Sequence, residues 1–430
     1  MKISLAYGRD GLVVDLPDDR TDVVAPRHQP ALPDPVAAIV DALDNPVDCA
    51  PLRERARPGQ QLVVSVCDIT RAQPREQMLQ ALFRHLDGVI TPEDVTILIA
   101  TGTHRGNTEV ELRAMLGDEV VDRCRIVNHD ARDASSLAFV GDTDDGVPVW
   151  LNRIWVEADL RVTTGFVEPH FFAGFSGGPK MVAPGLAGLE TVGHLHDARR
   201  IGSPDATWGI CVGNPVHDSI RAAAALAPPT LACDVLLDDQ KRVTQVFAGE
   251  LFAMHEQARE AARVAAMVEV AEPYAVVVTT NSGYPLDQNL YQAVKGMAAA
   301  EGVVCKGGVI VLAAECADGL PDHGSYAELL ASVTSTAALL ALFDDPEVTV
   351  PDQWTVQVQA RIGTKATVLV HADGLTDEQL AAAHLRPAPD IASAVRAALD
   401  DAGPDARVCV LPEGPQTIPY LADRVRQSVS

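Results

Sequence analysis

The sequence has 430 residues and a formal net charge of −25; 47% of its residues are hydrophobic and only 4% are aromatic. A chain of this length exceeds one ordinary core, so we expect two α/β domains packed with Val, Leu, Ile and Ala. The excess of acidic residues argues against nucleic acid and against an anionic membrane surface as partners, since both require clustered Lys and Arg. We interpret the acidity as that of a solvated surface, so an anionic substrate would need positive charge within its own site.

The eight cysteines are scattered along the chain, and none forms a CxxC pair. Several, such as Cys67 and Cys409, lie in apolar runs. This usage predicts buried free thiols in a reducing compartment, not a disulfide framework or a zinc ribbon. The chain opens directly on a strand-like stretch, and no apolar run reaches the length of a transmembrane helix. We therefore expect a cytoplasmic protein.

The first predicted elements are two short strands, 2–7 and 12–16, joined as a hairpin around Gly8 to Gly11. After a proline-rich connector, short apolar runs alternate with amphipathic stretches, which predicts a mostly parallel sheet covered by helices. In the first half the expected strands are 61–67, 94–100 and 158–164, and the expected helices are 75–87 and 108–116.

The second half repeats the alternation, so the fold class is α/β with two mostly parallel sheets flanked by helices. Its expected strands are 275–280, 308–314, 366–371 and 407–411, and its expected helices are 252–271, 287–300, 326–343 and 390–400. A long Ala-rich helix ends near Glu272-Pro273, which suggests a domain boundary. We predict an N-terminal domain over 1–272, a C-terminal domain over 273–405, and a segment 406–430 that packs back on the N-terminal domain.

Polar stretches follow two predicted strands, where parallel sheets bind ligands. After 61–67 come Asp68 and Arg71; the Arg can hold a carboxylate bidentately, and the Asp can orient it or bind a sugar hydroxyl. The plainer interpretation is that Asp68 or Thr70 caps a helix and Arg71 is a surface residue.

After strand 94–100 comes Thr101-Gly102-Thr103-His104. Gly102 permits a sharp turn, the threonines offer N–H groups and hydroxyls to a phosphate or carboxylate, and His104 can transfer protons near neutral pH. The alternative here is a loop histidine that caps a helix end.

A third stretch, Gly165 to Lys180, places Glu168, His170 and Lys180 among four phenylalanines. A lysine in such a dry site can act as a nucleophile or covalent anchor. Its sequence matches neither the Walker loop nor the dinucleotide fingerprint, and the plainer interpretation is a glycine-rich loop with an exposed lysine. Close approach of a ligand to the backbone is favoured by its glycines, Gly174, Gly177 and Gly178.

The pair His194 and His196 can bind a transition metal if the segment is a strand, because both rings then face one side; in a helix they diverge and only one can serve. Of the other histidines, His129 could support the site from behind, whereas His217 and His323 are expected to be structural.

A fourth polar stretch, 281–296, follows strand 275–280. It contains Tyr291, Gln292 and Lys295, of which Tyr291 and Lys295 share one helical face. Here too the pattern is compatible with an ordinary solvated helix end. Trp354 could wall a pocket or simply pack in the core.

With these motifs in view, the chain resembles the nickel-pincer-nucleotide-dependent lactate racemase family (LarA type) over nearly its whole length. The central motif is specific, because it combines Glu-Pro-His with Gly-Gly-x-Lys at a fixed spacing. The motifs that carry the resemblance are DITR at 68–71, TGTHR at 101–105, EPHFFAGFSGGPKMVAPGLAG at 168–188, LETVGHLH at 189–196 and YQAVKGM at 291–297.

The resemblance implies a cofactor, a pyridinium-3-thioamide-5-thiocarboxylic acid mononucleotide that carries Ni(II). Lys180 corresponds to the tethering lysine, although Pro179 before it departs from many members, and His196 corresponds to the nickel ligand, with no role assigned to His194. The proton-transfer residues correspond to His104 and His170. We assign the remaining cofactor contacts to Asp68, Thr101, Gly102, Thr103, Gly174, Ser176, Gly177 and Gly178.

For the substrate, the resemblance implies that Arg71, supported by Asp68, binds a carboxylate, and that Tyr291, Gln292, Lys295 and Trp354 line the pocket. The implied reaction is racemisation of a 2-hydroxy acid such as lactate, by reversible hydride transfer from substrate C2 to the pincer nucleotide, with the two histidines moving the hydroxyl proton. The active site is then expected in the cleft between the domains.

Other functions remain open on the sequence. The same chemistry could act on a larger 2-hydroxy acid, such as malate, a sugar acid or an aryl-lactate. A non-catalytic nickel- or nucleotide-binding protein is the alternative from another class, and a zinc hydrolase lacks a ligand cluster with its own spacing. The expected partners are the small-molecule substrate and the proteins that make the cofactor, with no nucleic acid and no membrane; no oligomeric state is predicted.

Overall fold

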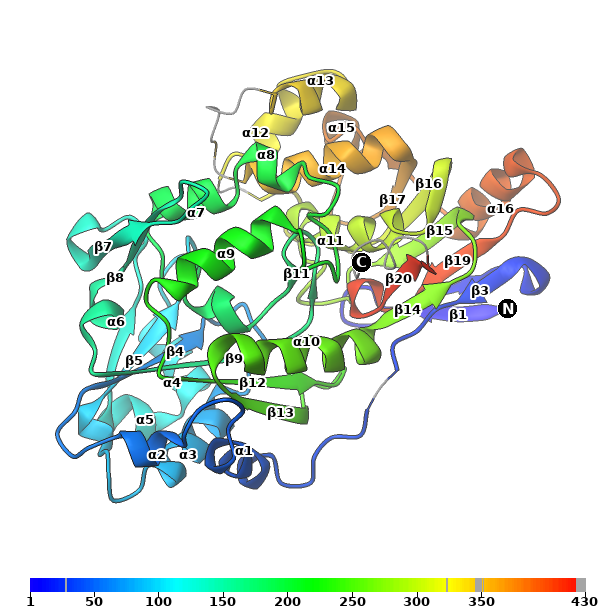
Figure 1. The fold of residues 1–430 in the computed structure, drawn as a ribbon. Coiled ribbons are helices and arrows are strands. Elements are labelled where there is room, and N and C mark those ends of the chain that lie inside the picture. Colours follow the sequence, from blue (N-terminus) through cyan, green and yellow to red (C-terminus); the bar gives the residue numbers. More distant parts are fainter. Residues whose placement is uncertain (28, 322–323, 345–349, 351, 423–430) are drawn as a thin grey trace. The chain divides into compact units, whose positions relative to one another are not determined.

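The computed structural model describes residues 1–27, 29–321, 324–344, 350 and 352–422, and the chain forms two compact units (Figure 1). The central unit comprises His28–Leu195 and Pro215–Ala265. The C-terminal unit comprises Met1–Arg27, His196–Asn214 and Ala266–Ser430. Each contains one six-stranded, mostly parallel sheet flanked by helices, so the predicted fold class is confirmed.

The sheet of the central unit has the order β13-β12-β9-β4-β5-β6, and only the β12–β13 pair is antiparallel. Its strands are β4 (Leu62–Cys67), β5 (Val95–Ala100), β6 (Arg125–Asn128), β9 (Leu160–Phe166), β12 (Leu231–Leu237) and β13 (Val243–Gly249). The inner strands are apolar and buried along their length because helices cover both faces.

Helices lie on both sides of this sheet (Figure 1). On one side α1 (Pro35–Asp44) and α3 (Arg75–His85) pack their apolar faces against the strands, and on the other lie α9 (Pro215–Ala225) and α10 (Leu251–Ala266). The remaining elements of the unit are α2 (Leu52–Arg55), α4 (Glu109–Leu116), α5 (Asp118–Arg123), α6 (Arg153–Glu157), α7 (Leu189–Leu195), and the hairpins β7–β8 (Leu137–Asp142, Pro148–Asn152) and β10–β11 (Pro169–His170, Gly174–Phe175).

The order of strands creates a switch point between β4 and β9. From β4 the chain proceeds outward through β5 and β6, whereas β9, β12 and β13 extend the sheet in the opposite direction. Connections at the carboxyl ends of two such strands diverge, and the crevice that they leave is the usual ligand position in open α/β sheets. The loops that follow β4 and β9 are those in which the sequence places the first and third polar stretches.

The C-terminal unit has an all-parallel sheet with the order β18-β17-β16-β15-β19-β3. Its strands are β3 (Thr21–Val23), β15 (Tyr274–Thr280), β16 (Val304–Ala313), β17 (Thr367–His371), β18 (Arg386–Pro387) and β19 (Val408–Leu411). On one face, α16 (Ile391–Ala402) and the β1–β2 hairpin (Lys2–Leu5, Leu12–Asp15) share a core with β15, β16 and β19.

The Ala-rich α11 (Leu290–Glu301) packs against β15 and β16. It can approach closely because Gly296 has no side chain, and a Cβ atom there would overlap the carbonyl oxygen of Thr280. Beside α11 lies α14 (Gln353–Lys365). The other elements are α8 (Ala198–Ile201), α12 (Tyr326–Ala331), α13 (Thr336–Ala341), α15 (Asp377–Ala382), and the β14–β20 pair (Met267–Val270, Ile418–Leu421). Among the described residues, no helix combines the length and apolar character that crossing a membrane requires.

The structure divides the chain differently from the predicted domains 1–272, 273–405 and 406–430. The first 27 residues belong to the C-terminal unit, because β3 pairs with β19 and the first hairpin lies in that unit's core. The segment after residue 405 supplies β19, which pairs with β15 in the C-terminal sheet. Residues 196–214 also join this unit, where Gln357 of α14 donates a hydrogen bond to the carbonyl of Ala198.

Two predicted helices differ in the structure. The helix expected over 252–271 ends at Ala266, and Met267–Val270, with two valines among its four residues, becomes a strand that pairs with β20. The helix expected over 326–343 is two helices, because Ser335 caps a new helix through a hydrogen bond from the Ala338 N–H. The prediction also missed the β12–β13 pair.

Candidate active site

The loop after β4 is held in place by a buried arginine. Arg75, in the first turn of α3, donates hydrogen bonds to the backbone carbonyls of Cys67, Asp68, Arg71 and Gln73. The side chain of Gln73 accepts from the Cys67 N–H at 2.7 Å and donates to Thr164 of β9 at 2.8 Å. The loop is therefore fixed to both strands of the switch point.

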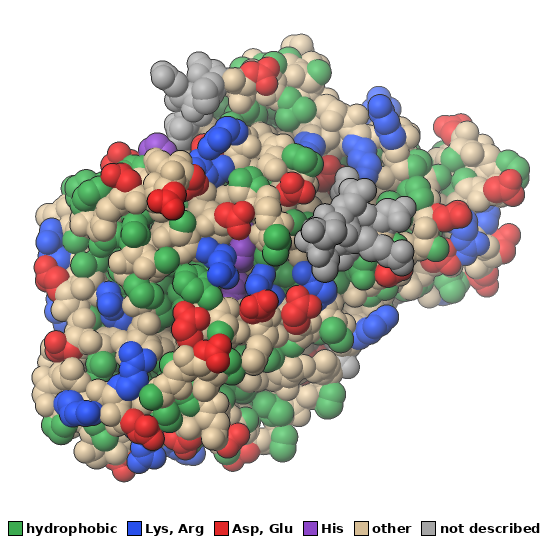
Figure 2. All heavy atoms as spheres, in the orientation of Figure 1, with side chains coloured by type: hydrophobic (Ala, Val, Ile, Leu, Met, Phe, Trp, Pro, Cys, Tyr) green, Lys and Arg blue, Asp and Glu red, His purple; other side chains and the backbone are tan. Residues whose placement is uncertain are grey.

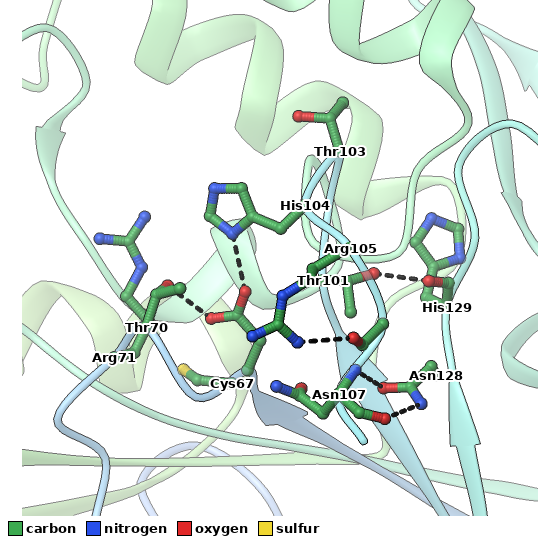
Figure 3. Close-up of polar contacts among 12 residues, drawn as sticks. Cys67, Thr70, Arg71, Thr101, Thr103, His104, Arg105, Asn107, Asn128 and His129 are labelled. Atoms are coloured by element: carbon green, nitrogen blue, oxygen red, sulfur yellow. Dashed lines mark hydrogen bonds and ion pairs between the residues drawn. The ribbon is translucent and has the colours of Figure 1, made fainter. Parts of the chain in front are cut away.

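That fixed loop presents Asp68 to His104, and the two form the best-defined polar pair among the predicted residues (Figure 3). His104 Nδ1 lies 2.7 Å from Asp68 Oδ2, and Thr70 donates to Asp68 Oδ1 at 2.7 Å. Asp68 is 3% exposed, and although burial raises its pKa, the hydrogen bonds from His104 and Thr70 bring the net shift below the usual value. A carboxylate only accepts, so Nδ1 carries a proton and Nε2 is left to accept another.

Arg71 and His104 point to the same side of this loop in Figure 3. Arg71 is exposed, and no side chain within the described ranges is a hydrogen-bond partner of its guanidinium. The plainer interpretation of this motif is wrong in its cap, because neither Asp68 nor Thr70 caps α3, which follows Pro74. Its surface arginine agrees with the exposure of Arg71.

The loop after β5 is docked on the loop that follows Lys180. Gly102, with φ +56, donates its N–H to the carbonyl of Gly185 at 3.0 Å. Thr101 donates to the backbone carbonyl of His129 at 2.6 Å, so its hydroxyl faces the protein interior. The side chain of Thr103 points away from the polar contacts in Figure 3.

His129 supports this arrangement from behind. Its Nδ1 accepts from Asn152 at 3.1 Å, and its Nε2 donates to the carbonyl of Ala187 at 3.0 Å. Burial lowers its pKa, so the ring stays neutral at neutral pH. A neutral histidine thereby connects the loops that carry His104 and Lys180.

His170 and Lys180 share an aromatic neighbour, Phe172. The His170 ring meets Phe172 edge-on at 4.5 Å between centroids, and Lys180 Nζ lies 5.7 Å from the centre of the same ring. His170 Nδ1 accepts a hydrogen bond from the Ala173 N–H at 3.3 Å. Both polar side chains are half-buried, so the interpretation of an exposed lysine on a surface loop does not hold.

The turn before Lys180 can be built only with glycine. Gly177 and Gly178 have φ values of +72 and +50, which side chains rarely adopt. A Cβ on Gly178 would lie 2.4 Å from His255 Cγ, and one on Gly177 would lie 2.6 Å from Asp234 Oδ2. The structure thus places two buried polar side chains, which sequence analysis had missed, directly against the turn.

Asp234 and His255 reach the turn from different elements. Asp234 lies on β12 and accepts the Gly178 N–H at 2.6 Å, and burial raises the pKa of its carboxyl to about 7. His255 lies on α10, and its Nε2 donates to the carbonyl of Ser176 at 2.8 Å. The one local signal for Asp234 is an acid within the apolar run LACDVLL; nothing near His255 in the sequence marks it.

Positive charge gathers near this turn despite the acidity of the whole protein. Burial lowers the pKa of His217 to about 3, and the positive charges of Arg259, Arg221 and Lys180 contribute to the shift. Figure 2 shows a histidine in this region with Lys or Arg side chains beside it and Asp or Glu side chains further out. The site can therefore attract an anion, as the charge argument from the sequence requires.

In the C-terminal unit, several further predicted residues lie together. The rings of His196 and Trp354 are 5.1 Å apart, and Trp354 Nε1 donates to the Tyr291 hydroxyl at 3.2 Å. One turn of α11 also holds Lys295 Nζ 2.8 Å from Gln292 Oε1. Trp354 is therefore part of this cluster and not only a core residue.

The HxH segment is helical. His194 lies on α7 and is exposed, whereas His196 follows the helix and is 7% exposed, so the two rings diverge. No group of three or more His, Cys, Asp and Glu in the described parts of the chain could hold a metal ion. His217 is buried beneath the glycine-rich turn and its ring is stacked 6.0 Å from His255, while His323 lies outside the described residues.

Comparison with known proteins supports the family resemblance in both halves of the chain. Residues 7–209 match the family model of the lactate racemase N-terminal domain, and residues 270–418 match that of the lactate racemase C-terminal domain. The chain is 34% identical to the lactate racemase of Thermoanaerobacterium thermosaccharolyticum over 420 residues, covering 97% of this chain and 98% of that protein. Identity to the lactate racemase of Lactiplantibacillus plantarum is 36% over 374 residues, or 87% and 88% of the two chains.

The structure of the lactate racemase apoprotein from T. thermosaccharolyticum matches with a TM-score of 0.90 at 33% identity, over 98% of this chain and all 100% of that one. A Thermotoga maritima protein of 19% identity matches with a TM-score of 0.67 over 90% and 99% of the chains, which shows a likeness of fold alone. Together, fold and relatives define an α/β enzyme of the isomerase class. Within that class, the chain belongs to the lactate racemase family.

Proposed function

We propose that this enzyme racemises a 2-hydroxy acid, with lactate as the first candidate, and that His104 and His170 move the hydroxyl proton. The observation that carries the proposal is the Asp68–His104 pair, which leaves Nε2 of a half-exposed imidazole to accept a proton, while the positive charge of Arg71 helps to lower the pKa of Asp68. A buried carboxylate that orients an imidazole is a recurring device for general acid–base catalysis.

The residues present fit a tethered pincer nucleotide. Lys180 offers a half-buried amine at the end of a glycine turn, beside an aromatic ring. His196, almost buried against Trp354, would be the one protein ligand of the nickel. When bound, the cofactor would accept and return a hydride at substrate C2. Asp68, Thr101, Gly102, Thr103, Gly174, Ser176, Gly177 and Gly178 are proposed as its further contacts.

The remaining proposed roles concern the substrate. Arg71 neutralises the carboxylate, and Tyr291, Gln292, Lys295 and Trp354 line the pocket. One imidazole removes the hydroxyl proton and the other returns it, because the two enantiomers present the hydroxyl differently. We further propose a cytoplasmic protein that depends on the enzymes of cofactor synthesis; its eight cysteines are all free, which suits a reducing compartment.

The experiment combines chiral analysis with mass measurement. Protein produced with the complete cofactor pathway is offered enantiopure lactate, malate, a sugar acid and an aryl-lactate, and both enantiomers are quantified. His104→Ala and His170→Ala are each expected to lower racemisation by about 10²-fold or more while the adduct mass persists, and Lys180→Ala is expected to lose the adduct. Full activity in either histidine variant would overturn the two-histidine assignment, and no turnover of any acid by the loaded wild type would overturn the function.

A further inference from the structure

Two buried side chains contact the turn that carries Lys180, and no role proposed so far uses them. Asp234 is 0% exposed and lies in β12, opposite Gly165 of β9. Its Oδ2 accepts the Gly178 N–H, whereas its Oδ1 has no hydrogen-bond partner among the described residues. His255, also 0% exposed, binds the carbonyl of Ser176 from α10.

The contacts are closer than ordinary packing requires. Cβ atoms on Gly165 and Gly177 would lie 2.8 and 2.6 Å from the two carboxylate oxygens of Asp234, and one on Gly178 would overlap the His255 ring. The turn is therefore enclosed between a carboxylate and an imidazole, with one backbone hydrogen bond to each. Gly178 begins a short 3-10 helix that continues through Pro179 and Lys180, so the orientation of the turn sets where the lysine side chain starts.

Fold stability alone does not explain an acid at this position. A carboxyl group buried in an apolar strand with one oxygen unpartnered is costly, and an apolar side chain of similar volume would usually be at least as stable. The acceptor that Asp234 provides is aimed at one backbone N–H, that of Gly178. This argues that its role is to fix the turn.

We propose that Asp234 and His255 are positioning residues for Lys180: from β12 and α10 they hold the Ser176–Gly178 turn and so fix the direction and reactivity of the lysine amine. The purpose of this positioning, attachment of a cofactor, rests on the proposed function. The positioning itself is a property of the chain and can be measured without the cofactor.

The test measures amine reactivity in full-length protein produced without the cofactor pathway. A short pulse of acetic anhydride is followed by peptide mass spectrometry, and acetylation of Lys180 is expressed relative to the exposed Lys241 and Lys306. Asp234→Ala removes the acceptor and is expected to raise the relative rate at Lys180 several-fold, because a turn that is no longer held exposes the half-buried amine to the reagent. Asp234→Asn keeps an acceptor for the Gly178 N–H and is expected to restore most of the wild-type rate.

Asp238→Asn is the matched control. Asp238 directly follows β12 and is 8% exposed, but its carboxylate pairs with Arg242 and does not contact the turn. If Asp234→Ala does not fold, His255→Leu and His255→Gln replace the pair, because Gln keeps a donor for the Ser176 carbonyl. A wild-type rate at Lys180 in Asp234→Ala, or equal changes in the Ala and Asn variants, would overturn the positioning role. A wild type that labels normally but never acquires an adduct would instead overturn the proposed function.

Discussion

Asp68 combines two properties that rarely occur together at one carboxylate. It is almost fully buried, and it still keeps a pKa below the usual value, because hydrogen bonds from His104 and Thr70 outweigh the effect of burial. The charged form is thus stabilised where it contacts the imidazole. The His104 ring itself is about half exposed, so it can meet a substrate while its other nitrogen is held.

Asp68→Asn is therefore expected to reduce racemisation strongly without unfolding the protein. The amide can donate to Nδ1, which would favour the tautomer with a proton on Nε2 and remove the proton acceptor. A loss of kcat of about 10²-fold or more follows if this orientation matters as it does in other acid–base sites. The measurement is steady-state racemisation of loaded enzyme, with the adduct mass checked in parallel. Asp87→Asn, an exposed acid, is the control; a kcat within twofold of wild type in Asp68→Asn, about 0.4 kcal/mol in the barrier, would exclude the pairing as a catalytic device.

At the scale of elements, the glycine-rich turn between β11 and Lys180 depends on two separate constraints, a positive φ and the absence of a side chain. Gly178→Ala violates both, because its Cβ would overlap His255. Gly146→Ala violates only the first, since Gly146 has φ +82 and nothing lies within 4 Å of its Cβ position. We expect Gly146→Ala to lower the free energy of unfolding by about 1 kcal/mol, and Gly178→Ala by about 2–4 kcal/mol.

Urea unfolding of the two glycine variants measures this difference. Lys180 acetylation in each then reports whether the turn has moved, and only Gly178→Ala is expected to change it. Equal stability losses in the two variants would mean that the His255 ring yields easily, so that the close packing around the turn is not a constraint.

The elements differ in how much their local sequence reveals. Apolar strands such as β4 and β5 were predicted because burial on both faces leaves an unbroken apolar run, and the polar residues after them were expected at the sheet edge for the same topological reason. β12 was missed although it is as buried, since an acid interrupts its run. Asp234 of β12 binds Gly178 in the turn, which is 56 residues away in sequence, and no local pattern encodes such a pairing.

Membership of a unit was also hidden from the sequence. The first two strands form a hairpin of their own, and it is the pairing of the next strand, β3, with β19 that joins the N-terminal segment to the C-terminal sheet. For the site, motifs predicted the side chains that face a ligand, such as His104 and Lys180. The sequence also suggested His129 as a supporting residue, whereas the contacts of Asp234 and His255 could not be predicted, because each binds a backbone atom of a loop far away in the sequence.

At the scale of the whole molecule, the protein is strongly acidic, yet its central unit encloses several neutral histidines. Burial lowers the pKa of His85, His129, His217 and His255 from the ordinary 6.5, for His217 to about 3. Asp234 is shifted the other way, from 3.8 to about 7. The lowered pKa values of the histidines and the raised pKa of Asp234 act on stability with opposite signs.

Below pH 6.5 the four histidines bind protons in the unfolded chain but stay neutral in the folded protein. Each therefore lowers the free energy of unfolding as the pH falls, by up to about 1.4 kcal/mol per pH unit. Asp234 holds its proton in the folded state at a pH where the unfolded carboxyl has lost it, so its contribution rises as the pH falls from 7 towards 3.8. Four histidines act against one carboxyl group, and we expect net destabilisation from pH 7 to pH 5.

Urea unfolding midpoints at pH 7, 6 and 5 test this expected loss of stability. His217→Gln should flatten the decline and Asp234→Asn should steepen it, because each removes one of the opposing contributions. A midpoint that stays level or rises towards pH 5 in the wild type would mean that the buried histidines do not dominate, and a flatter decline in Asp234→Asn would give its carboxyl the opposite sign.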